Sequence, residues 1–287
     1  MRIAVVGVGA IGGALAAMLE TAGGHELILC TRRPLQQLTV NSPDAVIRVQ
    51  ARNATQPEQA GPVDWIIVAT KTYDAEGAAR WFPALGATGA PVAVVQNGVE
   101  HRERFSRHIS AGRLLPVIIE CPVERTADGN VRVRGAATMQ IEDSALGCAF
   151  AALFTGSPVA IRLTPDMTTA AWSKLCINST GALCALAQKP TSVLWGDAMS
   201  RVALAIVEEC AAVGRAEGAR LDDAIGQRVL DHYRRLPPDS VNSLLADRRA
   251  GRRMETDARN GVIVRKGEKH GIPTPLNRMI VALLDAV

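Results

Sequence analysis

The feature that most constrains this 287-residue sequence is a glycine pattern near its start. Ile3 to Val6 is an apolar run of the kind that forms a buried parallel strand. It leads into Gly7-Val8-Gly9-Ala10-Ile11-Gly12, a G-x-G-x-x-G pattern opening a helix. In dinucleotide-binding folds the first glycine allows a tight turn, the second lets the backbone approach a pyrophosphate, and the third lets helix and strand pack closely. We therefore expect Gly7, Gly9, Ala10, Ile11 and Gly12 to bind a dinucleotide.

The residues after the glycines complete a strand-helix-strand unit. A helical period relates the apolar residues Ile11, Leu15, Met18, Leu19 and Ala22, and Gly23-Gly24 ends the run. Leu27 to Cys30 then reads as a second buried strand. This order of elements predicts an α/β protein whose N-terminal part is a Rossmann-type doubly wound sheet.

The end of the second strand indicates which dinucleotide is bound. NAD sites usually place an acidic residue there for the ribose 2′-hydroxyl, whereas this sequence has Thr31-Arg32-Arg33. A guanidinium group binds a phosphate bidentately. We therefore expect NADP(H) as the cofactor, with its 2′-phosphate bound by Arg32, although the sequence does not distinguish Arg32 from Arg33.

Two further strands are each followed by polar residues. Trp65 to Ala69 and Val92 to Val95 are apolar runs, followed by Lys71 and Asn97. Ligands of doubly wound sheets bind outside the carboxyl ends of the strands, so topology places Lys71 and Asn97 beside the glycine turn. A surface lysine and an ordinary Asn-Gly turn are the alternatives.

The connecting segments are less regular. Pro34 is expected to start a short helix, Ile47 and Val49 suggest a minor strand, and Asp74 is a plausible N-cap for a helix through Phe82.

Extended segments reappear after residue 114 and are expected to complete the sheet in antiparallel fashion. They are Leu115 to Ile119, Val131 to Arg134 and Thr138 to Ile141, with Asp128-Gly129 as a hairpin turn. Ser144 to Phe154 reads as a helix and Val159 to Leu163 as a last strand.

From there on the sequence predicts only helices, punctuated by glycines and prolines at Gly214, Gly218, Pro237-Pro238, Gly271 and Pro273. We therefore expect a cofactor domain over residues 1–163 and an all-helical substrate domain over residues 164–287.

Composition limits the classes of function. Charged residues make up 21% and hydrophobic residues 48%, which is typical of a globular chain. The net charge of +4 is mild and aromatic residues are only 3%, so nucleic acid is not expected as a partner. Glycines and alanines interrupt the apolar N-terminal stretch, and no other stretch resembles a membrane span. The sequence predicts a soluble, cytoplasmic protein.

Cysteine and histidine give no sign of a metal site. The six cysteines form no C-x-x-C pair and lie mostly among apolar neighbours, which is typical of reduced core residues. The five histidines form no ligand pattern, so we expect no metal.

A polar pair marks the first helix of the second domain. Lys174 and Asn178 are four residues apart and therefore share one helix face in an otherwise apolar segment. A bound carbonyl or carboxylate would be a natural partner for both. The alternative is a lysine whose stem packs on the apolar surface while its ammonium group reaches water.

Taken in order, these motifs resemble the ketopantoate reductases, NADPH-dependent enzymes that reduce 2-dehydropantoate to D-pantoate. The resemblance runs nearly end to end. It depends on G-x-G-x-x-G, Thr70-Lys71, Gln96-Asn97-Gly98, Lys174-Leu175 with Asn178, Ser243, Glu255 with Asp257, Asn260-Gly261 and the closing Gly271-Ile272-Pro273-Thr274-Pro275.

The resemblance implies a role for each matching residue. Lys174 would be the general acid that protonates the carbonyl oxygen, and Glu255 would hold the lysine or the nascent hydroxyl. Asn97 and Lys71 would line the nicotinamide side. Asn178 and Ser243 would bind polar groups of the substrate, and Asn97 would contact the substrate as well. His101 follows the Asn97 loop closely enough to be an alternative acid.

The chain departs from the family pattern after Asn178. Similar enzymes carry a second asparagine one turn later, whereas this chain reads Ser179-Thr180-Gly181-Ala182. Thr180 is a candidate to replace that amide in part. Because a missing hydrogen bond to a substrate hydroxyl alters selectivity, reduction of another keto acid or of an imine is the second hypothesis.

A non-catalytic NADP(H)-sensing protein is the third hypothesis. A sensor needs no proton donor, and Lys174, Asn178 and Glu255 together argue against it. For an enzyme, the expected partner is a small keto acid, and an apolar helix of the second domain would suit a homodimer.

Overall fold

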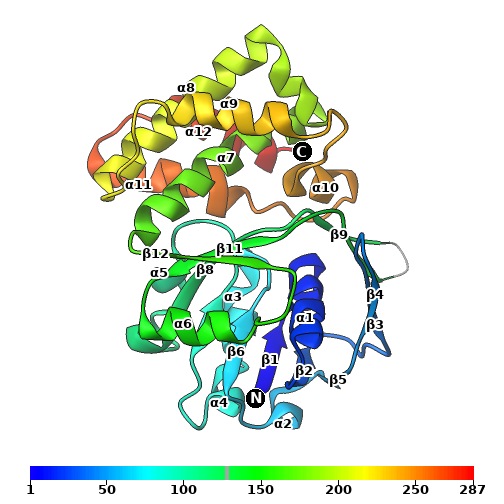
Figure 1. Cartoon of the computed structure of the whole chain (residues 1–287). Helices are drawn as coiled ribbons and strands as arrows, with labels where there is room; N and C mark the ends of the chain where they lie inside the picture. The colour runs from blue at the N-terminus through cyan, green and yellow to red at the C-terminus, as the bar shows by residue number, and fades with distance from the viewer. Residues whose placement is uncertain (127–128) are drawn as a thin grey trace. The chain divides into compact units, whose positions relative to one another are not determined.

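The computed structural model describes residues 1–126 and 129–287, which form two compact units (Figure 1). We call residues 1–96 and 100–167 the sheet unit, and residues 97–99 and 168–287 the helical unit. No sequence pattern indicated that the short segment Asn97–Val99 groups with the helices.

The sheet unit is built on an eight-stranded sheet. Its strand order is β12-β11-β8-β7-β6-β1-β2-β5. The strands are β1 Arg2–Val6, β2 Glu26–Cys30, β5 Ala51–Ala54, β6 Trp65–Val68, β7 Val92–Val94, β8 Leu114–Glu120, β11 Thr138–Glu142 and β12 Ala160–Thr164. The six strands from β5 to β8 are mutually parallel, while β11 pairs antiparallel with β8. This arrangement confirms the predicted doubly wound sheet.

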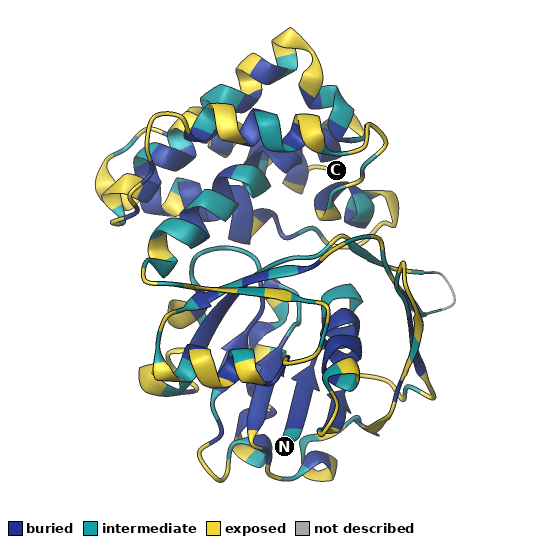
Figure 2. Cartoon of the chain, in the orientation of Figure 1, coloured by how far each residue is buried: buried dark blue, intermediate teal, exposed yellow. Residues whose placement is uncertain are grey.

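The apolar strands are buried because both faces of the sheet carry a core. Along β1, Ile3 and Val5 point into one core, whereas Ala4 and Val6 point into the other. Figure 2 shows β1 and the strands beside it as buried. Because both faces of these strands are buried, their sequences are uninterrupted apolar runs rather than alternating ones.

Helices complete the two cores of the sheet unit. They are α1 Ala10–Ala22, α2 Pro57–Ala60, α3 Ala75–Ala79, α4 Phe82–Leu85, α5 His101–Phe105 and α6 Ala145–Ala152, with short 3₁₀ turns η1 Thr72–Asp74 and η2 Ala111–Arg113. On one face the ring of Phe150 in α6 packs 5.3 Å from that of Trp65 in β6.

A second sheet, which the sequence did not indicate, packs against α1. Its strand order is β4-β3-β10-β9, with β3 Leu38–Asn41, β4 Val46–Val49, β9 Val123–Arg125 and β10 Val131–Val133. The expectation that Val131 to Arg134 completes the main sheet was therefore wrong, although β10 does form a strand. The expected turn residue Asp128 lies outside the described residues.

Two local expectations were also wrong. No helix begins at Pro34, because Asn53 accepts a hydrogen bond from the Leu35 amide and β3 begins at Leu38. Asp74 does occupy an N-cap position, but its helix α3 ends at Ala79 and a separate helix α4 begins at Phe82.

The helical unit contains no strand among its described residues. Its elements are α7 Met167–Ala187, η3 Thr191–Trp195, α8 Asp197–Ala216, α9 Ile225–Arg235, α10 Ser243–Arg249, η4 Asp257–Gly261, α11 Val262–His270 and α12 Pro275–Asp285. Side chains of α7, α8 and α9 dominate one continuous core. The predicted all-helical second domain is confirmed, and among residues 1–126 and 129–287 no helix has the length and apolar composition needed to cross a membrane.

Gly214 does not end a helix, as the sequence had suggested, but lies inside α8. A β-carbon at this position would lie 3.0 Å from ring atoms of Trp172 on α7. The glycine therefore lets the indole pack directly onto the α8 backbone. Gly271 behaves as predicted, because it ends α11 in the left-handed conformation.

Four of the six cysteines are buried, as predicted. Cys30, Cys176, Cys184 and Cys210 are buried free thiols, Cys121 is half-buried, and Cys148 is exposed on α6. The buried residues of this helix are Gly147 and Phe150, and Cys148 does not share their face.

One carboxylate of the helical unit binds three cationic side chains. Glu217 lies 2.8 Å from Lys266 and from Lys269, and 2.6 Å from His270. Partial burial alone would raise the pKa of Glu217, but the hydrogen bonds from these three side chains lower it to about 2. The Glu217 cluster therefore joins the end of α8 to α11.

We predict that Glu217→Gln lowers stability near neutral pH by about 2 kcal/mol, because the nearly buried Lys266 loses a charged hydrogen-bond acceptor. A carboxylate with a lowered pKa stabilises the fold above its unfolded pKa and loses this contribution as pH falls. The difference in the free energy of unfolding between wild type and Glu217→Gln should thus become smaller from about pH 5 down to about pH 2, as measured by thermal unfolding. Glu208→Gln, at an exposed site in α8, is the control. A difference in the free energy of unfolding that does not change with pH would contradict the prediction.

Candidate functional site

The glycine turn between β1 and α1 has the shape that a pyrophosphate needs. Gly7 has a φ of +92°, and a β-carbon there would lie 2.6 Å from Thr70. A β-carbon on Gly12 would lie 2.0 Å from the carbonyl oxygen of Gly7. Gly9 differs, because no described atom beyond Gly9 and its two chain neighbours lies within 4 Å of its β-carbon position. The first and third glycines are therefore required by packing, and the second leaves the backbone open, which fits a dinucleotide.

The two arginines after β2 are both exposed. The Thr31 hydroxyl donates to the carbonyl oxygen of Arg33 at 2.7 Å, and the Asn53 amide donates to Thr31 at 2.7 Å. Because β2 pairs in parallel with β1, Arg32 and the glycine turn leave neighbouring strands at the same edge of the sheet.

Gln96 joins the loops that follow β6 and β7, a function that the sequence did not reveal. Its side-chain nitrogen donates to the hydroxyl and the carbonyl oxygen of Thr70 at 3.0 and 3.1 Å, and to the carbonyl oxygen of Lys71 at 3.4 Å. Its side-chain oxygen accepts from Arg104 at 3.1 Å. The loop that carries Lys71 is thus fixed to the residue that precedes Asn97.

His101 is a structural residue and a poor candidate for an acid. It is 3% exposed, and its Nε2 lies 2.8 Å from the carbonyl oxygen of Gln96. Burial, assisted by Arg104 and Arg102, lowers the pKa of His101 to about 4 despite that backbone contact. The imidazole is therefore neutral at pH 7.

Within the helical unit, three of the residues singled out from the sequence meet at Asn97. The Asn97 Nδ2 donates to Glu255 Oε2 at 3.0 Å, and the Asn97 Oδ1 accepts from Asn178 Nδ2 at 3.3 Å. Glu255 is only 4% exposed. We call Asn97, Asn178 and Glu255 the amide-carboxylate cluster. A buried carboxylate beside two amides can orient a cation and a polar ligand.

Gly98 allows the chain to enter this cluster. Its φ is +92°, and a β-carbon would lie 2.7 Å from the carbonyl oxygen of Ala258. A side chain at this position would therefore move Asn97 away from Glu255.

Lys174 lies half-buried on α7, one turn before Asn178, as the helical spacing predicted. Ser243 is the exposed first residue of α10, and its Oγ accepts from Arg259 Nη2 at 2.6 Å. Arg259 was not singled out from the sequence. No spacing in the sequence marked it, because Glu255 precedes the helical turn that carries Arg259.

The structure does not support Thr180 as a substitute for the missing amide. Thr180 has no exposed surface, and its Oγ1 donates to the carbonyl oxygen of Ile177 at 2.8 Å. The hydroxyl is therefore bound within its own helix, as threonines in helices commonly are.

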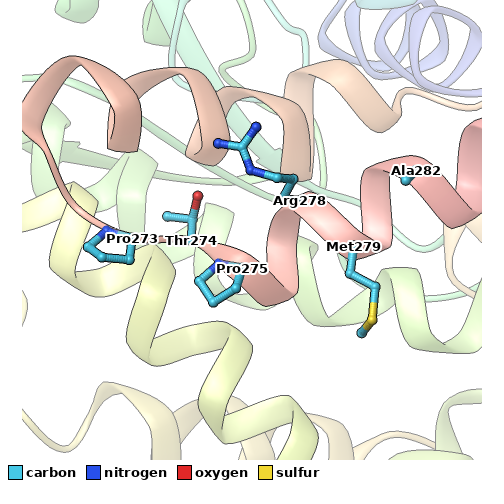
Figure 3. Close-up of a pocket in the computed structure, with 6 residues that line it drawn as sticks. All are labelled: Pro273, Thr274, Pro275, Arg278, Met279 and Ala282. Carbon is cyan, nitrogen blue, oxygen red and sulfur yellow. The ribbon is translucent and has the colours of Figure 1, made fainter.

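A shallow pocket on the helical unit is lined by none of these residues (Figure 3). Its lining residues are Pro273, Thr274, Pro275, Arg278, Met279 and Ala282. The one charged side chain among them, Arg278, already lies 2.7 Å from Glu268. This pocket lacks the convergent polar groups of a catalytic site.

Comparison with protein families gives two adjoining matches. Residues 3–145 match the family described as Ketopantoate reductase PanE/ApbA, and residues 166–287 match the family described as Ketopantoate reductase PanE/ApbA C terminal. Together they span most of the chain.

Individual relatives extend over the whole sequence. The chain is 46% identical to a 2-dehydropantoate 2-reductase of Caulobacter vibrioides over 284 residues, which is 99% of this chain and 98% of the relative. It resembles the crystal structure of a 2-dehydropantoate 2-reductase from Geobacter metallireducens with a TM-score of 0.93 at 26% identity, covering 100% and 99% of the two chains. A D-mandelate dehydrogenase with NADH and anilino(oxo)acetate has the same fold, with a TM-score of 0.90 at 22% identity and coverage of 100% and 97%.

We predict opposite effects of one added methyl group at two glycines of the turn. Gly12→Ala should cost about 2 kcal/mol or more, because its β-carbon overlaps the Gly7 carbonyl, although alanine normally stabilises a helix. Gly9→Ala should leave stability within about 0.5 kcal/mol but weaken binding of the dinucleotide. Thermal unfolding and fluorescence titration with NADPH measure the two effects; equal stability of both variants would contradict the packing assignment.

Proposed function

Because the chain belongs to the ketopantoate reductase family, we propose that it catalyses the NADPH-dependent reduction of 2-dehydropantoate to D-pantoate. It is thus an oxidoreductase that forms a CH–OH group. The observation that carries the proposal is the amide-carboxylate cluster, in which buried Glu255 lies 3.0 Å from Asn97 and α7 brings Lys174 one turn before Asn178. A merely cofactor-binding protein has no need of this cluster.

We infer that the sheet unit holds the dinucleotide. Its glycine turn fits the pyrophosphate, and Gly7, Gly9, Ala10, Ile11 and Gly12 supply that turn. When bound, the reduced nicotinamide supplies the hydride. The turn and the family membership together support a nicotinamide cofactor.

The preference for NADP(H) over NAD(H) is supported by Arg32. It is exposed directly after β2, at the edge of the sheet where the glycine turn also lies, and no acidic residue occupies Thr31 to Arg33. A guanidinium there favours a 2′-phosphate. Lys71, half-buried after β6, and Asn97 are assigned to the nicotinamide side.

Lys174 is assigned as the general acid. Its ammonium group polarises the keto oxygen and donates a proton to it as the hydroxyl forms. Glu255, buried and acidic, stabilises that ammonium group and orients either the lysine or the new hydroxyl. Asn97 keeps the Glu255 carboxylate in place through its 3.0 Å hydrogen bond.

Asn178 and Ser243 are assigned to the polar groups of the substrate. Asn178 has a second amide hydrogen beyond the one it donates to Asn97, and Ser243 is exposed at the start of α10. Neither Thr180 nor a second asparagine adds a hydrogen-bond donor to the substrate site. Substrate selectivity therefore depends on fewer side chains than in similar enzymes that carry the second asparagine. A cytoplasmic location and a homodimer remain predictions; one structural relative, from Staphylococcus aureus, is described as dimeric.

The test follows NADPH oxidation with 2-dehydropantoate beside a panel of other 2-keto acids. We expect 2-dehydropantoate to give the highest kcat/KM, and Lys174→Ala to lower kcat by about a hundredfold or more with NADPH binding unchanged, because the proton donor is lost. Lys189→Ala, an exposed lysine beyond the same helix, is the matched control. Higher kcat/KM for another keto acid would overturn the substrate, and unchanged turnover in Lys174→Ala would overturn the acid.

Replacement of Arg32 tests the cofactor preference. Arg32→Ala should raise the KM for NADPH by about tenfold or more and leave the KM for NADH nearly unchanged, since only NADPH carries the 2′-phosphate. Arg33→Ala then distinguishes the two neighbouring, exposed arginines, since a larger rise in the KM for NADPH in that variant would assign the phosphate to Arg33. Equal losses for both cofactors would contradict the role of Arg32.

A further inference from the structure

Arg259 is a buried cation to which the reaction described above gives no role. It lies in η4, a π-helical turn that follows Glu255 and precedes α11. Only 3% of the residue is exposed. π-Helical turns occur frequently at functional sites, and a buried charge is costly unless it acts on a partner.

The partner of Arg259 is Ser243. The Nη2 of Arg259 donates to the Oγ of Ser243 at 2.6 Å, while its Nε has no hydrogen-bond partner among residues 1–126 and 129–287. Ser243 itself is an exposed residue. The buried guanidinium is therefore bonded to the hydroxyl of an exposed residue.

Arg259 keeps its positive charge in this setting. Burial lowers the pKa of Arg259, but Glu255, Tyr233 and Asp247 act in the opposite direction, and an arginine side chain keeps its charge in proteins. Asp247 also forms a 2.9 Å ion pair with Arg252, so its charge is shared between two arginines. The group that donates to Ser243 is therefore cationic.

The hydrogen bond from Arg259 also determines whether the Ser243 hydroxyl donates or accepts toward a ligand. A guanidinium has no acceptor, so the Ser243 oxygen must accept and its own proton must be donated elsewhere. A hydroxyl that accepts from a cation is polarised into a stronger donor. The Ser243 hydroxyl is therefore suited to donate a hydrogen bond to an anion.

We propose that Arg259 is a positioning residue that, through Ser243, makes the substrate site select the carboxylate of a keto acid over a neutral carbonyl compound. The inference depends on the proposed function for the identity of the substrate. The carboxylate is the group selected because it is the anionic group of a 2-keto acid, whereas a substrate hydroxyl would gain little from the buried charge.

The test compares the 2-keto acid with its methyl ester, which lacks the negative charge. In Arg259→Met we expect the KM for the keto acid to rise by about 10- to 100-fold, the size of one charged hydrogen bond, with a much smaller change in kcat. The kcat/KM for the ester should change by less than about threefold. Equal losses for acid and ester would overturn the inference, because a purely structural role affects both.

Two further variants isolate the route through Ser243. The double variant Ser243→Ala, Arg259→Met should have about the same KM as Ser243→Ala alone, whereas multiplied effects would contradict action through Ser243. Arg252→Met is the matched control, because Arg252 also pairs with Asp247 but is 56% exposed in its side chain. It should leave the preference for the acid over the ester unchanged; loss of that preference would assign the effect to Asp247 and overturn the inference.

Thermal unfolding establishes that each variant is folded at the assay temperature. If Arg259→Met is not folded at that temperature, Arg259→Lys is used in its place. This variant keeps a positive charge but loses the guanidinium geometry. We expect its KM for the keto acid to rise by about threefold or more and its KM for the ester to stay unchanged. An unchanged KM for the acid would overturn the inference.

Calorimetric binding of D-pantoate with NADP separates this inference from the proposed function. Wild type that binds D-pantoate but does not reduce 2-dehydropantoate would contradict the proposed function alone. Equal Kd values for D-pantoate in wild type and Arg259→Met would contradict the inference alone.

Discussion

The carboxamide of Asn97 is the group on which the candidate site depends. It donates to Glu255 and accepts from Asn178, residues 158 and 81 positions away in the sequence. An asparagine side chain is suited to this position because it has a donor and an acceptor at one end. Without it, the buried Glu255 would lose a partner that a buried carboxylate needs. The left-handed backbone at Gly98 is what lets the chain pass close enough to Ala258 for these bonds to form.

Much of the fold was predictable because its signals are local. The G-x-G-x-x-G turn, the period of α1 and the apolar runs of β1, β2, β6 and β7 each depend on neighbouring residues, and their order then specifies a doubly wound sheet. The helices after residue 167 were equally accessible from their periodicity. For the site, helical spacing related Lys174 to Asn178, and the resemblance to a family added Ser243 and Glu255.

What sequence reasoning missed depends on contacts between distant segments. Ala51 to Ala54 carries no apolar alternation and becomes a strand only by pairing with β2. The second sheet likewise forms because β3 pairs with β10, some ninety residues later in the chain. Gln96 looked like part of a turn until its bonds to Thr70 and Lys71 were seen. Arg259 looked like one of many arginines, and its burial behind Ser243 could not be read from a linear spacing.

The bonds of Gln96 have a consequence for motion. Because the Gln96 side chain belongs to the loop after β7 and bonds to the loop after β6, displacing one loop breaks hydrogen bonds to the other. A molecule that orders one loop therefore reduces the entropy still to be lost when a second molecule orders the other. Through this amide, the two loops can make successive binding events cooperative without any large rearrangement of the sheet.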